Sequence, residues 1–203
     1  MSDFIEIYDK ALTHDECDLI LDRMHKLKDE WRPAMSGPEI VDKKQKEGMD
    51  LGLSFIHSGE GIYREIAEPI IRSLFKYSKK YCDRYNSLNY VPYFGIFDQW
   101  NLQYFNPGGG YKAPHCEHGD EGYKKERVLV WMFYLNNAKS GTKFLAQNRT
   151  IKAKKGRLVI WPASVTHVHV GVIPNRDDKY IATGWYNYVG YGVTENPNVN
   201  SGS

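Results

Sequence analysis

The N-terminal part of the chain alternates between polar and apolar residues with the period of an α-helix. Thr13 is a favourable helix N-cap residue, and Glu16, three residues later, completes a capping box. Apolar residues then recur at helical spacing over residues 17–27, which predicts a helix with one buried face. A second helical stretch covers residues 62–85, and Pro69 is expected to kink it or to begin a segment of it.

Short β-type runs replace the helical pattern from about residue 91. Clusters of Asn, Gly, Pro and Asp separate the runs and mark turns. Strands are expected at residues 96–105, 128–135, 142–145, 157–161, 165–172 and 180–189, and a short opening strand at 4–8. Several short strands with such turns indicate a sandwich or a barrel.

The pattern predicts one α+β domain, mainly β, over residues 1–190. A helical support is expected over about 1–90 and a β core over about 91–190, followed by a polar tail at 191–203. The irregular stretch 31–58 is expected to be a long loop that acts as a lid over a substrate site.

Composition excludes several classes of protein. The chain has 203 residues, of which 41% are hydrophobic and 26% charged, as in an ordinary globular domain. Its longest apolar run, residues 128–135, is far shorter than the roughly 20 residues of a membrane helix. The net charge of +2 argues against nucleic acid as a partner. The three cysteines are an odd number without a repeat spacing, which together with the expected absence of a signal peptide favours a cytoplasmic protein. The oligomeric state is left open.

Two histidine clusters carry the candidate chemistry. His115 and Glu117 are two residues apart, so in a strand both side chains point to the same side, and His169 follows in a later strand. Two imidazoles and one carboxylate on one face of a metal leave open positions, as in non-heme Fe(II) oxygenases. His118 with Asp120 is the alternative pair in the first cluster.

The second cluster also leaves a choice, between His167 and His169. His167 is interpreted as a neighbouring or surface histidine. Ten residues beyond His169, Lys179 begins a strand in which it shares a face with Ile181 and Thr183. A lysine that points into a barrel is costly unless it meets an anion, which a dicarboxylic co-substrate would provide.

In this order, the motifs resemble those of the Fe(II)/2-oxoglutarate dioxygenases. The similarity covers about residues 98 to 188 and is greatest to prolyl 4-hydroxylase-like enzymes of bacteria and their phages. The motifs are Tyr111-x-x-x-His115-x-Glu117, the run 130–136, the run 156–163 with His169, and the run 179–185. The resemblance implies a double-stranded β-helix, or jelly roll.

The resemblance also implies roles for individual residues. His115, Glu117 and His169 would bind Fe(II), although the family more often has Asp where this chain has Glu117. Lys179 would pair with the distal carboxylate of 2-oxoglutarate, and Thr183 and Tyr134 would hydrogen-bond to it. The family often has a further tyrosine before the Gly-rich turn, a place for which Tyr104 and Phe105 compete, and Tyr104 is the residue assigned to it.

The activity implied is hydroxylation of an unactivated C–H bond with dioxygen and release of succinate and CO2. A prolyl residue in a peptide or protein is the expected substrate, and L-ascorbic acid is an associated reductant of such enzymes. A carboxylate at Glu117 favours hydroxylation over halogenation. The alternatives are a same-fold oxygenase acting on a free amino acid or a nucleic-acid base, and a non-catalytic jelly-roll module that binds a metal or ligand.

Overall fold

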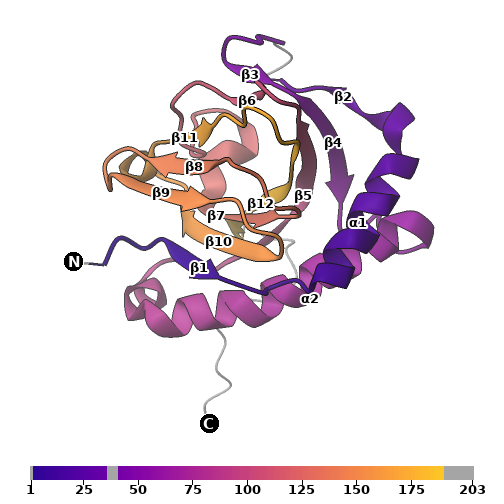
Figure 1. Ribbon diagram of the computed structural model, residues 1–203. Helices are drawn as coiled ribbons and strands as arrows, with labels where there is room; N and C mark the ends of the chain where they lie inside the picture. Colours follow the sequence, from indigo (N-terminus) through magenta and orange to yellow (C-terminus); the bar gives the residue numbers. More distant parts are fainter. Residues whose placement is uncertain (1, 36–40, 190–203) are drawn as a thin grey trace.

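The computed structural model describes residues 2–35 and 41–189, and the tail expected at 191–203 lies outside them. Two α-helices lie at the edge of a β-structure (Figure 1). The helices are α1 (His14–Lys26) and α2 (Gly61–Arg84), with short 3-10 helices η1 (Lys28–Glu30), η2 (Asn86–Tyr90), η3 (Gly122–Glu126) and η4 (Val165–His167). Within the described ranges, neither α-helix is long and apolar enough to cross a bilayer.

A seven-stranded sheet forms the centre of the molecule, and all of its neighbouring strands are antiparallel. In spatial order the strands are β1 (Glu6–Tyr8), β10 (Arg157–Pro162), β7 (Arg127–Tyr134), β12 (Lys179–Tyr188), β5 (Phe94–Phe105), β4 (Met49–Ser54) and β2 (Arg32–Pro33). β12 pairs with both β5 and β7, which come earlier in the sequence. This pairing brings the motif at residues 179–185 next to motifs that precede it in the chain.

A second, smaller sheet packs against one face of the large one. It consists of β11 (His169–Val172), β8 (Gly141–Phe144) and β9 (Arg149–Lys152), and a two-stranded ladder of β3 (Lys46–Glu47) and β6 (Gly110–Tyr111) lies beside it. The two facing antiparallel sheets are those of a jelly roll, as predicted.

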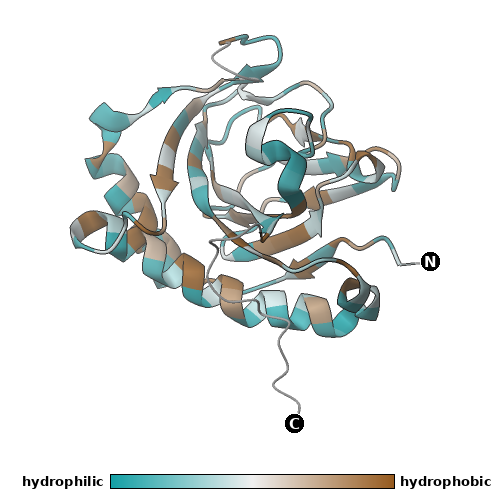
Figure 2. Cartoon of the chain, turned by 180° about the vertical axis from the view of Figure 1, so that it is seen from behind, coloured by the Kyte–Doolittle hydropathy of each residue, from teal (hydrophilic) through white to brown (hydrophobic). Residues whose placement is uncertain are grey.

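The two faces of the large sheet bury different clusters of residues. Alternate residues of β7 illustrate this: Trp131 and Phe133 pack with the helices, while Val130, Met132 and Tyr134 face the smaller sheet. Brown and teal segments alternate along α1 and α2, as expected for helices with one buried face (Figure 2). The helices therefore support the sheet from behind and leave its other face for a site.

The predicted capping box at the start of α1 is confirmed. The backbone N–H of Glu16 donates to Thr13 Oγ1 at 3.1 Å, and the Glu16 carboxylate accepts from the Thr13 backbone at 2.8 Å. The predicted loop at 31–58 is wrong in part, because β2, β3 and β4 lie within it. β4 pairs with β5 and β3 with β6, which are distant in sequence and give no local pattern, and β2 in turn pairs with β4.

Candidate active site

The loop that follows β6 carries His115 and Glu117 and is fixed at both residues by backbone hydrogen bonds. The N–H of His115 donates to His169 O at 3.0 Å, and the N–H of His169 donates back to His115 O at 2.8 Å. The N–H of Glu117 donates to Ala163 O at 3.1 Å. Residues 46 and 54 positions apart are thus held side by side by the peptide backbone itself.

The three predicted metal ligands converge on one point between the sheets. Glu117 Oε1 lies 3.5 Å from His115 Nε2 and 3.8 Å from His169 Nε2. One donor atom from each residue lies within 4.8 Å of the others, and no other such cluster occurs in the described part of the chain. Two imidazole nitrogens and one carboxylate oxygen at this spacing suit an Fe(II) ion with open positions.

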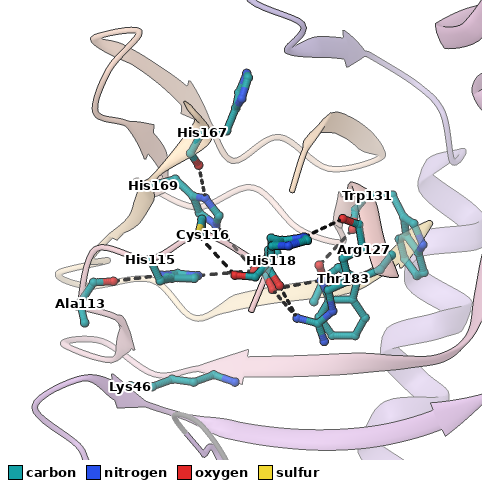
Figure 3. Close-up of polar contacts among 12 residues, drawn as sticks. Lys46, Ala113, His115, Cys116, His118, Arg127, Trp131, His167, His169 and Thr183 are labelled. Carbon is teal, nitrogen blue, oxygen red and sulfur yellow. Dashed lines mark hydrogen bonds and ion pairs between the residues drawn. The ribbon is translucent and has the colours of Figure 1, made fainter. Parts of the chain in front are cut away.

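Backbone carbonyls orient both imidazole rings toward this point. His115 Nδ1 lies 3.0 Å from Ala113 O, and His169 Nδ1 lies 2.9 Å from His167 O, as the dashed lines in Figure 3 show. A carbonyl accepts only from an N–H, so each Nδ1 carries the proton and each Nε2 keeps its lone pair. Metal-binding histidines are typically held in this way.

The second oxygen of Glu117 is held by two donors from other elements. Arg127 Nη1 lies 3.1 Å from Glu117 Oε2, and Trp185 Nε1 donates to the same oxygen at 3.0 Å. Arg127 also donates to the backbone oxygen of Glu117 at 3.0 Å, and its guanidinium lies 3.6 Å from the centroid of the Trp185 ring. With Oε2 occupied, Oε1 is the oxygen that remains for a metal.

The protonation states also suit a divalent cation. Burial opposes ionisation of Glu117, but His115, His169 and Arg127 outweigh it and hold the pKa of Glu117 well below its usual range. Burial, with His115 beside it, lowers the pKa of His169 to about 4. The ligands are therefore an anion and a neutral imidazole near neutral pH, the forms that bind metals.

A cavity of about 460 Å³ adjoins the three ligands and extends over the inner face of β12. Lys179, Ile181 and Thr183 all line it, so the predicted shared face is confirmed. Lys179 is only 4% exposed, and its Nζ lies 4.8 Å from the centroid of the Phe105 ring. Among the described residues no carboxylate pairs with Lys179, and burial lowers its pKa to about 8.

Two other predicted co-substrate residues occupy different positions relative to the cavity. Thr183 lines it, and its hydroxyl donates to Trp131 O at 3.0 Å. Tyr134 is fully buried behind Thr142, with 2.8 Å between their hydroxyl oxygens, and Thr142 is the one that lines the cavity. The structure therefore does not place Tyr134 in the cavity wall, where its direct contact with a co-substrate was predicted, and Thr142 lies between Tyr134 and the cavity.

The prediction for Tyr104 is wrong. In the β5–β12 ladder Phe105 lies opposite Lys179 and therefore shares its face, so Tyr104 points the other way. The Tyr104 ring stacks on Tyr180 with 4.9 Å between centroids, and its hydroxyl donates to Asp178 at 3.0 Å. Phe105, not Tyr104, lines the cavity.

The alternative ligands lie outside the cluster. Asp120 and His118 are exposed, and neither belongs to the group of converging donors. His167 lies in η4 and not in the strand expected for it; its ring points away from His169 toward Asp3 O, 2.7 Å from Nε2 (Figure 3). His167 thus contacts His169 through its backbone oxygen, and its side chain is not one of the converging donors.

Sequence reasoning missed the role of Arg127 and of a second buried ion pair. Arg127 belongs to the basic run 124–127, which predicted a solvated surface, yet its side chain is only 7% exposed. Lys46 of β3 is also buried in the cavity wall, where its Nζ lies 2.5 Å from Asp50 Oδ2. No sequence signal identified Lys46 and Asp50, because the strands that bury them were not predicted.

Comparison with known proteins agrees with this geometry. Residues 100–187 match the family model of the 2OG-Fe(II) oxygenase superfamily, and no curated protein matches the chain. This match, the fold and the cluster of His115, Glu117 and His169 support a 2-oxoglutarate-dependent dioxygenase, and members of the matched superfamily use Fe(II), 2-oxoglutarate and dioxygen.

Solved structures with this fold include several prolyl hydroxylases. A prolyl-4-hydroxylase of Pseudomonas putida has a TM-score of 0.66 at 16% identity and covers 93% of this chain and 95% of its own. A viral collagen prolyl hydroxylase of Paramecium Bursaria Chlorella virus-1, solved with 2OG, has a TM-score of 0.63 at 21% identity, covering 92% and 97%. A Trichoplax adhaerens prolyl hydroxylase, in complex with a peptide fragment of hypoxia inducible factor, has a TM-score of 0.70 at 14% identity, covering 92% and 84%. The chain therefore has a prolyl 4-hydroxylase-like fold.

Proposed function

We propose that this protein hydroxylates a prolyl residue in a peptide or protein. The observation that carries the proposal is the pairing of two features in one cavity: the cluster of His115, Glu117 and His169, and the buried Lys179 with no anion beside it among the described residues. The first fits Fe(II), and the second fits one end of a diacid.

In this proposal His115, Glu117 and His169 bind the iron through Nε2, Oε1 and Nε2. When bound, the iron supplies the chemistry that activates dioxygen against a C–H bond. The protein supplies orientation: the carbonyls of Ala113 and His167 hold the imidazoles, and Arg127 with Trp185 holds the free carboxylate oxygen.

The co-substrate 2-oxoglutarate would enter with its distal carboxylate toward Lys179. The ammonium group there is desolvated, so its attraction to a carboxylate is only weakly screened by water. The Thr142 hydroxyl, in contact with Tyr134, lies on the same cavity wall and would donate to that carboxylate, and the Thr183 hydroxyl would do so after turning away from Trp131 O. Phe105, on which Lys179 lies, would exclude water from one side of the ion pair.

A prolyl substrate is supported by the enzymes that share the fold, two of which are named as acting on collagen or crystallised with a peptide. The test is to incubate the protein with Fe(II), 2-oxoglutarate and proline-containing peptides. We expect release of succinate together with a peptide mass increase of one oxygen atom. Succinate without any peptide modification would reject the prolyl substrate while retaining the oxygenase.

Two carboxylates of the same loop provide a matched control for the metal assignment. Glu117→Ala should abolish metal binding and succinate release, because it removes the anionic ligand. Asp120→Ala should behave like the wild type, because Asp120 is exposed outside the cluster. The opposite result would transfer the role to the alternative pair, and His115→Ala with wild-type turnover would end the assignment.

A further inference from the structure

A second cavity continues the catalytic one along the inner face of the large sheet. Its volume is about 590 Å³, comparable to the 460 Å³ of the catalytic cavity. Asn101, Tyr123 and Trp185 line both, so the two form one groove. The metal and 2-oxoglutarate would be held in the first cavity, which leaves the second without a role in the proposed chemistry.

The floor of this groove contains a glycine that the fold itself does not require. Gly52 lies inside β4, is exposed, and faces its neighbour Asn101 across the β4–β5 ladder. Its φ is not in the left-handed region, and an added Cβ would meet only Asn101 Oδ1, at 3.7 Å. Glycine within a strand weakens it and often marks a place where a ligand or another backbone comes close.

The groove also offers hydrogen-bonding groups that the protein does not use. Within the described residues, no hydrogen bond involves the side-chain amide of Asn101 or of Gln99, and both line the groove. The strand β2 pairs with β4 only at Met49 and Asp50, so none of the strands in residues 2–35 and 41–189 pairs with β4 on that side over residues 51–54. Free amides beside an uncovered strand suit the alternating N–H and C=O groups of an extended chain.

The charge of the lining favours a polypeptide over a nucleic acid. Glu30, whose two carboxylate oxygens accept from the hydroxyl of Tyr63, lines the second cavity and brings a negative charge to it. No lysine or arginine is among the described residues that line this second cavity. A phosphate backbone needs cations along its path, whereas a peptide backbone does not.

From these observations we infer that Gly52 and Asn101 form the floor of a track for the substrate residues that flank the hydroxylated one. The substrate is then a polypeptide segment in extended form, and a free amino acid would leave the track empty. This inference rests on the proposed function and specifies its substrate class.

The test adds side chains to the floor of the track. Gly52→Ala and Gly52→Val place one and three carbons where the peptide would lie, and Gly59→Val is the matched control. Gly59 is exposed, has open space around it, and is not part of the groove. Succinate release by the iron-loaded protein is measured with a proline-centred peptide library, with free amino acids and with a short single-stranded oligonucleotide. The melting temperature of each variant reports whether it folds.

We expect peptides alone to stimulate the wild type and Gly59→Val. Gly52→Val should fold normally but raise the peptide KM about tenfold or more, with Gly52→Ala between it and the wild type. Equal peptide KM values in all four proteins would overturn the track and leave the proposed function intact. Stimulation by free amino acids or by the oligonucleotide, and not by peptides, would overturn both the track and the proposed prolyl hydroxylation. Both would also be overturned if peptides, amino acids and the oligonucleotide all failed to stimulate the wild type. If Gly52→Val does not fold, Gly52→Ala decides by the same KM criterion.

Discussion

Lys179 makes the binding of 2-oxoglutarate depend on pH in a range where ordinary lysines do not titrate. Burial lowers its pKa to about 8, and only the protonated form attracts a carboxylate. Below that pH the ammonium is present and binding is strong; above it, binding must take up a proton. The protonated fraction falls from about 0.9 at pH 7 to about 0.1 at pH 9, so the Kd for 2-oxoglutarate should rise about tenfold, or about 1.4 kcal/mol.

Anaerobic titration calorimetry with Mn(II) in place of iron measures this directly at pH 7, 8 and 9. Near pH 8 the wild type should take up about half a proton per ligand, which a comparison of buffers with different ionisation enthalpies reveals. Lys179→Arg keeps its charge throughout this range and should remove both the pH dependence and the proton uptake. A wild-type Kd that stays constant to pH 9, or an arginine variant with the same tenfold rise, would refute this role for Lys179.

The remaining predictions concern side chains around the site and in its support. Arg127→Met should weaken Mn(II) binding about 10- to 100-fold in a metal titration, because Glu117 loses a partner that orients it, and an unchanged affinity would show that Trp185 alone suffices. Tyr104→Phe should leave the Kd for 2-oxoglutarate unchanged, since the Tyr104 ring packs on the opposite face of β5; a large loss would restore the rejected contact. Thr13→Ala should lower the free energy of unfolding by about 1 kcal/mol in urea denaturation, and a neutral result would mean that the capping box adds no stability.

The local sequence pattern was sufficient to predict the elements in which buried positions recur at regular spacing. β5, β7 and β12 alternate or run apolar over many residues, and the capping box of α1 is visible in four consecutive positions. β3 and β4 have charged and glycine positions instead, and they exist because β5 and β6 provide their pairing partners. Such long-range pairing leaves no periodic signal.

The site shows the same division between spacing and register. The two-residue spacing of His115 and Glu117 lies within one loop, and the ten-residue spacing of His169 and Lys179 joins the starts of two consecutive strands, so both can be followed along the chain. The choice between Tyr104 and Phe105 depended on which residue lies opposite Lys179, which only the ladder register decides. Arg127 was hidden in a basic run because the ring that covers it, Trp185, comes 58 positions later.

The reciprocal backbone bonds between His115 and His169 have a consequence for how iron is acquired. Because peptide groups make these bonds, the three ligands are held close together before any ion arrives. The metal site is preorganised, so the chain does not have to become ordered when iron binds. No ordering step then slows binding or lowers the affinity for iron. Iron can therefore dissociate and bind again without any change in the fold of the protein.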